Sequence, residues 1–278
     1  MNGLVDMSSL MYKMASRAKH TPDPIHVAAR NTLMYLTRPP YNVKKMICCF
    51  DGKNSKQRRR SIYPKYKGNR KDNPLKEIVV GALNLVESLI HLTAFPYVCM
   101  DELEADDVIA SLVSTMKGYK VIFSDDKDLY QLVTQDVVQV DINGQEIILP
   151  HTPDEHLTVK VLNGDSSDNV SGVTGLGPVR IEKLLDEHRT LRAIMEQGEI
   201  DGHLGKMIYP KAEEVIQRNV VLMRLTNHPL LTQQDHEDVK MCVQSTWYNT
   251  WDVDALVDDF GFDRHELNTM ILLGGKKR

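Results

Sequence analysis

Carboxylate side chains are concentrated at a few points of this sequence, and each point follows a short apolar run or lies in a glycine-rich loop. Carboxylates this close repel one another unless cations neutralise them, and hard divalent cations such as Mg²⁺ prefer oxygen ligands. Two such ions about 4 Å apart can stabilise the attacking and leaving oxygens of a phosphodiester. We therefore interpret nine acids as ligands of a two-metal site. They are Asp6, Asp51, Glu104, Asp106, Asp107, Asp126, Asp128, Asp165 and Asp168.

The spacing inside these groups favours a shared role. Glu104 and Asp107 are three residues apart at the start of a predicted helix, so they share one face of it. Asp126 and Asp128 are two residues apart in a loop, where both can point at one ion. Acids in a first helical turn are common because they suit the helix dipole, so any single group would be ordinary. The joint pattern of four strand ends plus a fifth group favours a metal site.

Positive charge is concentrated in one segment that begins directly after Asp51. Nine Lys or Arg residues and no acid lie between Lys53 and Lys71. Cations neutralise phosphates and interleaved tyrosines can stack on unpaired bases, whereas the alternative is a solvated loop. The position beside the acids favours a nucleic-acid contact, from which Lys67 or an arginine could stabilise charge on a scissile phosphate. The residues of this segment that we expect to bind nucleic acid are Lys56, Arg58, Arg59, Arg60, Tyr66 and Arg70.

A glycine-rich loop lies shortly after the last acidic pair. The run Gly172-Val173-Thr174-Gly175-Leu176-Gly177-Pro178 precedes a predicted helix that begins near Val179. Glycines let a backbone approach a phosphate closely, and a helix N-terminus adds positive potential. Three glycines also make an ordinary tight turn, but the place of this loop favours phosphate binding by Gly172, Gly175 and Gly177.

The elements that position these residues alternate between short apolar runs and helical patterns. The runs before Asp6, Asp51, Asp101 and Asp125 are continuous rather than alternating, which is typical of strands covered on both faces. Apolar residues at helical spacing between them, over 75–90 and 108–116, predict a parallel α/β sheet flanked by helices. In such a sheet, ligands bind at the carboxyl ends of the strands, where these acids lie.

The composition changes after Pro150, so we divide the chain into three parts. Residues 1–150 form an α/β core, in which a small hairpin is expected around Asn143-Gly144. Residues 151–225 have a helical pattern with glycine-rich breaks and form a second subdomain. The C-terminal segment, 226–278, carries no pattern that assigns it.

The bulk composition excludes several classes of protein. The chain has 278 residues, a 42% apolar fraction and a net charge of −4, which are ordinary for a folded protein and hide the basic segment. No apolar stretch reaches eighteen residues and no secretory pattern is present, so we expect neither a membrane partner nor export. The four cysteines follow neither a zinc pattern nor a disulfide framework, which indicates a reducing, cytoplasmic setting.

At these residues the sequence resembles the 5′-nuclease family, which includes phage flap endonucleases and the N-terminal nuclease domain of bacterial DNA polymerase I. The shared motifs come in family order between about residues 4 and 185. They are Val5-Asp6, Phe50-Asp51-Gly52, Tyr66-Lys67-Gly68-Asn69-Arg70, Glu104-Ala105-Asp106-Asp107, Asp126-Lys127-Asp128-Leu129-Tyr130, Gly164-Asp165-Ser166-Ser167-Asp168-Asn169 and Gly172-Val173-Thr174-Gly175-Leu176-Gly177.

The resemblance implies a PIN-like sheet with a helical arch at about 52–92 and a helix-hairpin (helix-3-turn-helix) subdomain at 151–225 that holds duplex DNA. It implies that Lys67 is the electrophilic lysine, with Tyr66 stacking beside it. By the same resemblance, the acids from Asp6 to Asp107 hold one divalent ion, and those from Asp126 to Asp168 hold the second. Mg²⁺ is expected there, with Mn²⁺ as the alternative, and a K⁺ ion is expected at the helix-hairpin.

The function implied is that of a structure-specific 5′ nuclease, both a flap endonuclease and a 5′-3′ exonuclease, which removes RNA primers and flaps in DNA replication and repair. The partners would be DNA with 5′ ends or flaps and RNA primer–DNA junctions, met by a monomer in the cytoplasm of a bacterial cell or phage-infected host cell. Because no polymerase segment follows, we expect a stand-alone nuclease.

The sequence departs from the family pattern at a few positions. Met7 stands where glycine is usual, and the short first strand predicts a natural start upstream of Met1. Val179 stands where a lysine is common, and we expect Arg180 to supply that charge to DNA.

Two other functions compete with this reading. A ribonuclease on a related acidic core is one, but the helix-hairpin features and the length favour DNA structures. A non-catalytic DNA-binding module is the other, and loss of acids would mark it, whereas every acid is present.

Overall fold

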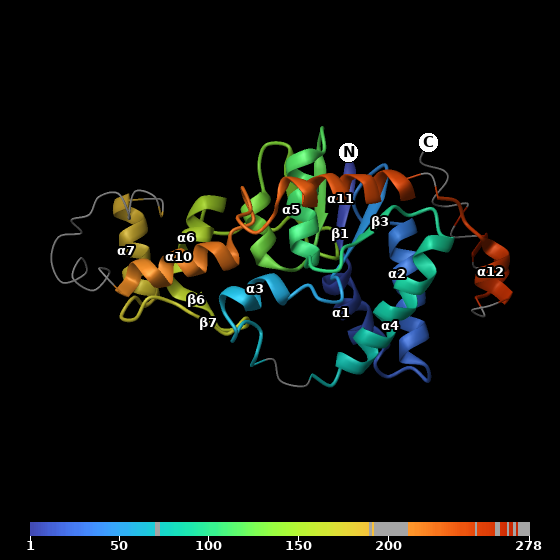
Figure 1. Ribbon diagram of the computed structural model, residues 1–278. Helices are drawn as coiled ribbons and strands as arrows, with labels where there is room; N and C mark the ends of the chain where they lie inside the picture. Colours follow the sequence, from blue (N-terminus) through green and yellow to red (C-terminus); the bar gives the residue numbers. More distant parts are fainter. Residues whose placement is uncertain are drawn as a thin grey trace.

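A five-stranded parallel sheet forms the centre of the computed structural model (Figure 1). The strand order is β3-β2-β1-β4-β5, so the chain starts in the middle of the sheet and extends it on both sides. The residues that the structure describes are 1–69, 73–188, 191, 211–247, 249–258, 262–265, 267, 268 and 271. The strands are β1 (Asn2–Asp6), β2 (Met46–Phe50), β3 (Tyr97–Cys99), β4 (Lys120–Phe123) and β5 (Val137–Val140). The predicted parallel α/β sheet is confirmed.

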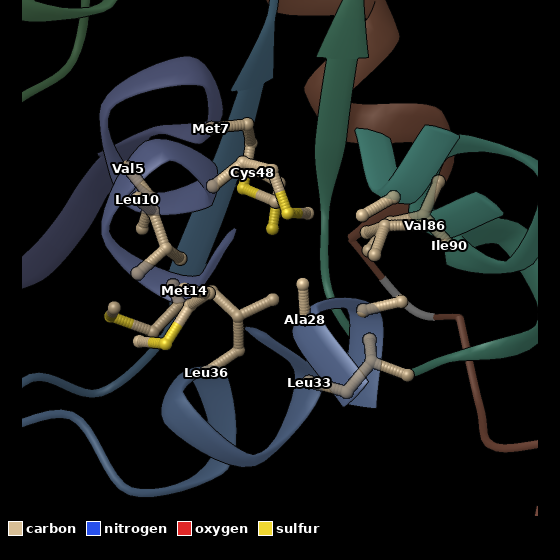
Figure 2. Close-up of a cluster of buried hydrophobic side chains, with 14 of the residues drawn as sticks. Val5, Met7, Leu10, Met14, Ala28, Leu33, Leu36, Cys48, Val86 and Ile90 are labelled. Carbon is tan, nitrogen blue, oxygen red and sulfur yellow. The ribbon is translucent and has the colours of Figure 1, made fainter. Parts of the chain in front are cut away.

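The apolar runs are continuous because helices cover both faces of the sheet. One face packs against α1, α2 and α4 through Val5, Cys48 and their neighbours (Figure 2). The alternate residues Leu4 and Ile47 turn to the other face, against α5 and α11. The bounds of these helices are α1 (Met7–Ala18), α2 (Pro24–Thr37), α4 (Lys76–Leu89), α5 (Ala105–Thr115) and α11 (Gln233–Thr246).

The segment predicted as an arch contains two helices. A short helix α3 (Gln57–Ile62) follows β2, and α4 begins after the stretch 70–72, which lies outside the described residues. The helices exist where the prediction placed them, and the name arch stays a prediction.

Residues 151–225 contain a separate hydrophobic cluster, formed by α6, α7 and α10 on the left of Figure 1. A two-stranded antiparallel ribbon of β6 and β7 lies between α6 and α7. The predicted domain boundaries at 150 and 225 remain a prediction. The bounds are α6 (Pro153–Asn163), β6 (Gly164–Asp165), β7 (Val170–Ser171), α7 (Pro178–His188) and α10 (Lys211–Met223).

Three shorter helices complete the elements that the structure describes. The 3-10 helix η1 (Ile90–Leu92) precedes β3, η2 (Lys127–Leu132) follows β4, and α12 (Val253–Asp258) comes after α11. The turn at Gly144 is present with φ +89°, and the expected hairpin is reduced to a single bridge between Val140 and Glu146, while β5 pairs with β4 in the sheet. None of the described helices is long and apolar enough to cross a membrane.

Candidate metal centre

The carboxyl ends of β1 and β2 bring the first two acids together. Asp6 ends β1 and caps α1, where its carboxylate accepts from the Ser9 backbone N–H at 3.0 Å. Asp51 follows β2 and accepts from the Ala105 backbone N–H at 2.8 Å and from Ser8 Oγ at 2.7 Å. The hydrogen bond to Ala105 ties Asp51 to the first turn of α5, which carries the next acids.

An open pocket, here called the acidic pocket, is formed where these elements meet. It contains predicted ligands from β1, β2, α5 and the loop after β4, together with Lys67. Its walls also include exposed hydroxyl groups of α1. The predicted site residues that line it are Asp6, Asp51, Lys67, Glu104, Asp106 and Asp126.

A second, smaller cavity lies beside the acidic pocket and holds the later acids. It is lined by Asp128, Asp165 and Asp168, and Asp106 lines both spaces. The structure therefore brings the two predicted groups of ligands to one region, with Asp106 between them. Three carboxylates of α5's first turn place ligand atoms within 4.8 Å of one another: those of Glu104, Asp106 and Asp107.

The electrostatics of this region fit divalent cations. Burial, together with the neighbouring Asp51 and Asp126, raises the pKa of Asp6 to about 7. Burial and Asp107 raise the pKa of Asp106 well above its usual range, and burial with Asp128 raises that of Asp126. A raised carboxyl pKa means that burial and neighbouring carboxylates disfavour the ionised form more than the nearby protein cations favour it. Mg²⁺ or Mn²⁺ bound to these oxygen ligands would supply the missing positive charge.

Lys67 lies between the two groups of acids. Its Nζ is 2.6 Å from Glu104 Oε1 and 3.8 Å from Asp168 Oδ2. Burial opposes the charged form, but Glu104, Asp168 and Asp106 together outweigh it and raise the pKa of Lys67. Lys67 has a positive φ of 52°, and its backbone N–H donates to the Asp168 carbonyl at 2.8 Å. The lysine predicted to be catalytic thus lies at the acids, on a constrained backbone.

Tyr66 lies beside Lys67, and the Lys67 Nζ is 5.0 Å from the centre of the Tyr66 ring. We expected Tyr66 to contact DNA, but its ring is not available to stack on a base. The residue is 3% exposed and packs against Val170 and Leu222. Its hydroxyl lies 2.9 Å from Glu104 Oε2 and 3.1 Å from Asp168 Oδ2, so its single hydrogen can be donated to either carboxylate. The ring is buried against β7 and α10, and the hydroxyl faces two acids.

Lys160 is a site residue that the sequence analysis missed. Its ammonium group contacts Asp128 and lies 2.8 Å from Asp165 Oδ2. Burial opposes its charge, but Asp128 and Asp165 outweigh it and raise the pKa of Lys160. Burial would raise the pKa of Asp165, yet Lys160 and Ser167 lower it to about 2. The available signal was a lysine in the last turn of a predicted helix, five residues before an acid.

Arg59 is placed differently from the prediction, which assigned it to nucleic acid. Its side chain is 2% exposed, and its guanidinium binds Glu104 at 2.8 Å and Asp107 at 2.6 Å. Burial works against the ionised form of Asp107, but Arg59 and His228 outweigh it and hold the pKa of Asp107 well below its usual range. A buried guanidinium with acid partners cannot also neutralise a phosphate at the surface.

Arg58 is likewise engaged within the protein rather than directed at nucleic acid. Its guanidinium forms a two-pronged pair with Asp235, at 2.7 and 2.9 Å, and also contacts Glu102 at 3.2 Å. The pair joins α3 to the start of α11, in the segment that the sequence left unassigned. Despite partial burial, Arg58 and Thr232 lower the pKa of Asp235 to about 2.

We expect Arg58→Ala to reduce stability rather than DNA affinity, because the variant leaves the largely buried Asp235 without its cationic partner. The melting temperature should fall by several degrees, at about 2–4 °C for each kcal/mol lost in a chain of this size. Lys53→Ala is the matched control, since that residue is exposed and lines the groove described next. Thermal melts and fluorescence anisotropy with labelled DNA measure the two effects. An unchanged melting temperature with weakened DNA binding would restore the original prediction for Arg58.

Another open space, here called the basic groove, is formed by the loop after β2 and by α3. Lys53, Lys56 and Arg60 line it, and it shares Asp51, Lys67 and Glu104 with the acidic pocket, so the two spaces adjoin. Among the predicted DNA contacts, Lys56 and Arg60 line this groove, and their contact with DNA stays a prediction. Arg70 lies outside the described residues.

The structure explains why two positions of the glycine-rich loop are glycine. Gly175 has a φ of +86°, and a Cβ on Gly172 would lie 2.2 Å from the Asn163 carbonyl oxygen. A Cβ on Gly177 would meet no atom within 4 Å. Arg180 donates from its guanidinium to the Gly175 carbonyl at 2.7 Å. The loop is thus a tight turn before α7, and its contact with DNA stays a prediction.

The sequence matches the family model described as the N-terminal resolvase-like domain of 5′-3′ exonucleases over residues 3–158, more than half of the chain. It is 38% identical over 149 residues to DNA polymerase I of Deinococcus radiodurans, which covers 50% of this chain and 15% of the polymerase. It is 30% identical over 179 residues to a 5′-3′ exonuclease of Aquifex aeolicus, 60% of each chain. The chain thus spans less than two thirds of these relatives.

A solved structure shares the fold. It is the flap endonuclease of bacteriophage T5 in a complex with DNA and metal ions, with a TM-score of 0.70, 20% identity, and coverage of 88% of this chain and 98% of that one. The likeness confirms the PIN-like fold class. At this level of identity it shows the fold alone.

Proposed function

This chain belongs to the 5′-3′ exonuclease family through its N-terminal resolvase-like domain, and from that we propose that it is a structure-specific 5′ nuclease that hydrolyses DNA phosphodiesters. The observation that carries the proposal is the meeting of carboxylates from four strand ends around one lysine. The acidic pocket and the basic groove share Asp51, Lys67 and Glu104, so phosphate-binding groups adjoin the acids. A phosphodiester held by the groove would lie beside the acids.

Two divalent cations fit this donor set. Asp6, Asp51, Glu104 and Asp106 would hold the first, and Asp126, Asp128, Asp165 and Asp168 the second. When bound, the ions would supply an activated water and neutralise charge on the phosphate oxygens. We propose Mg²⁺ at both places, with Mn²⁺ as a substitute. A K⁺ ion bound by backbone oxygens of the glycine-rich loop is part of the same proposal.

The protein's own groups prepare the phosphate for attack. Lys67 can donate to a phosphate oxygen, because its ammonium group stands in the acidic pocket and in the basic groove. Glu104 and Asp168 orient that ammonium group, and the Tyr66 hydroxyl lies within hydrogen-bond distance of the same two carboxylates. Such a preorganised donor is worth more than a mobile one because its orientation costs nothing at the moment of reaction.

The substrates that we propose are DNA with 5′ ends or flaps and RNA primer–DNA junctions. The basic groove suits a single strand, since Lys53, Lys56 and Arg60 line the same open space as Asp51 and Glu104. Removal of primers and flaps in replication and repair is the corresponding role, for a monomer in the cytoplasm of a bacterial cell or phage-infected host. The relatives named as DNA polymerase I and 5′-3′ exonuclease support this setting.

A gel assay tests the function. A 5′-labelled flap on duplex DNA should be cut when Mg²⁺ is present and stay intact in EDTA, while the matched flush duplex without a flap releases only short products from its 5′ end. An RNA strand of the same sequence measures the ribonuclease alternative. Absence of cutting on the DNA flap in Mg²⁺ and in Mn²⁺ would refute the proposal.

A further inference from the structure

Hydrogen-bond donors of the protein already occupy the acceptor positions of the Asp107 carboxylate. Oδ1 accepts from Arg59 at 2.6 Å and from His228 at 2.7 Å. Oδ2 accepts from Arg59 and from the Glu104 backbone N–H, both at 2.9 Å. An ionised carboxylate offers about four acceptor positions, so these four donors occupy it fully. A metal ion would have to displace one of them.

A hydrogen bond at Nδ1 of His228 fixes the tautomer of the imidazole ring. The Leu230 backbone N–H donates to Nδ1 at 3.2 Å, so Nδ1 is an acceptor and Nε2 carries the hydrogen that Asp107 receives. The ring is 1% exposed, and it belongs to the segment between α10 and α11. A residue 121 positions away in sequence therefore sets the orientation of Asp107.

Arg59 transmits this arrangement to Glu104. One guanidinium nitrogen donates to Glu104 Oε2 at 2.8 Å, while another atom of the group, Nε, donates to the Leu222 carbonyl at 3.0 Å. With Oε2 held in this way, Glu104 presents Oε1 to Lys67. His228, Asp107, Arg59 and Glu104 thus form a continuous buried chain that ends in the acidic pocket.

We propose that His228 is a positioning residue of the metal centre, which acts on Glu104 through Asp107 and Arg59, and that Asp107 belongs to this unit instead of binding a metal ion directly. The inference rests on the proposed metal-dependent function. It gives the segment after α10 a role in the site. It also assigns different roles to the neighbouring acids Asp107 and Asp106. Asp106 lines both metal-binding spaces, and its Oδ1 accepts from the Asp107 backbone N–H.

Groups that orient metal ligands typically contribute 10- to 100-fold to metal affinity or activity. We therefore expect His228→Leu to weaken Mn²⁺ binding about tenfold or more, measured by calorimetry on metal-free protein, and to slow single-turnover cleavage at subsaturating Mg²⁺. His228→Gln keeps an N–H donor near the position of Nε2 and should stay close to the wild type. This rescue separates the hydrogen bond from the volume of the side chain.

The matched control is His236→Leu. His236 lies in the same C-terminal part of the chain and also bonds to α5, since its Nδ1 is 2.8 Å from Ser111 Oγ, one turn beyond Asp107. Its loss should lower the melting temperature yet leave Mn²⁺ affinity unchanged. Equal weakening of Mn²⁺ binding in His236→Leu and His228→Leu would overturn the proposal, as would wild-type Mn²⁺ affinity in His228→Leu.

Asp107→Asn tests the second half of the proposal and serves if His228→Leu does not fold. It should bind the same number of Mn²⁺ ions as the wild type, but more weakly, whereas loss of one ion would show that Asp107 is a ligand. In the double variant with His228→Leu, the losses should be less than additive, because both residues act in one unit. Calorimetry also separates failure of this proposal from failure of the proposed function. If the positioning role is wrong, His228→Leu binds Mn²⁺ as the wild type does. If the proposed function is wrong, the wild type binds Mn²⁺ yet cuts no flap.

Discussion

Asp126→Asn is expected to abolish flap cleavage while the protein still binds flap DNA. Asp126 caps η2 by accepting the Asp128 backbone N–H at 2.9 Å, and asparagine keeps that acceptor and nearly the same shape. What it removes is negative charge from a carboxylate that lines the acidic pocket, where the proposed mechanism requires a cation. We expect the single-turnover rate in Mg²⁺ to fall on the order of a thousandfold or more, at the upper end for loss of one preorganised interaction.

Binding and cleavage separate in this variant because the removed charge repels phosphate. Affinity measured by anisotropy without a divalent ion should stay equal or rise slightly. Asp136→Asn, an acid in the exposed turn before β5, controls for a general effect of charge removal and should cut as the wild type does. Cleavage by Asp126→Asn at near the wild-type rate would remove Asp126 from the metal centre.

The sheet and the grouping of the acids could be predicted from the sequence because both follow from one local pattern. Each strand reads as a continuous apolar run, and the acid that follows it marks the carboxyl end. Parallel strands share that end, so the sequence order of Asp6, Asp51 and Asp126 is enough to place them at one edge. The fifth strand, β5, was expected as one arm of the small hairpin and not as a strand of the parallel sheet, because its short run has a polar Gln139 inside it, which weakens the same signal.

The roles of the arginines could not be predicted from the sequence. Arg58, Arg59 and Arg60 are consecutive on α3, so they point in directions about 100° apart. The first reaches Asp235, the second turns into the core, and the third lines the basic groove. Composition describes all three as phosphate-binding cations. Their different partners become visible only when the chain after α10 folds back against α3.

The ammonium and imidazole partners of the acids were missed for a related reason. Lys160 lies in a helix of a different hydrophobic cluster from the strand ends, and His228 lies in a segment without a recognisable pattern. Repulsion among nine carboxylates suggested metal ions alone. The structure shows that protein cations contribute as well, with Arg59 at Asp107 and Lys160 at Asp165.

Lys67→Ala is expected to slow cleavage strongly while binding changes little. The Nζ of Lys67 lies 2.6 Å from Glu104, inside the space that a scissile phosphate would enter, so its removal takes away a preorganised donor. Loss of one such donor typically costs about a hundredfold or more in rate.

The backbone should survive this substitution, because the Lys67 N–H still donates to the Asp168 carbonyl when the side chain is shortened. Single-turnover rates at saturating enzyme and Kd values for a flap, each at two salt concentrations, separate catalysis from binding. Lys56→Ala is the control: it removes a cation of the basic groove, so it should weaken binding in a salt-dependent way with little effect on the saturated rate. If both variants lose the same affinity and the same rate, Lys67 is one more phosphate contact, and the stabilisation of charge at the scissile phosphate must come from the metal ions alone.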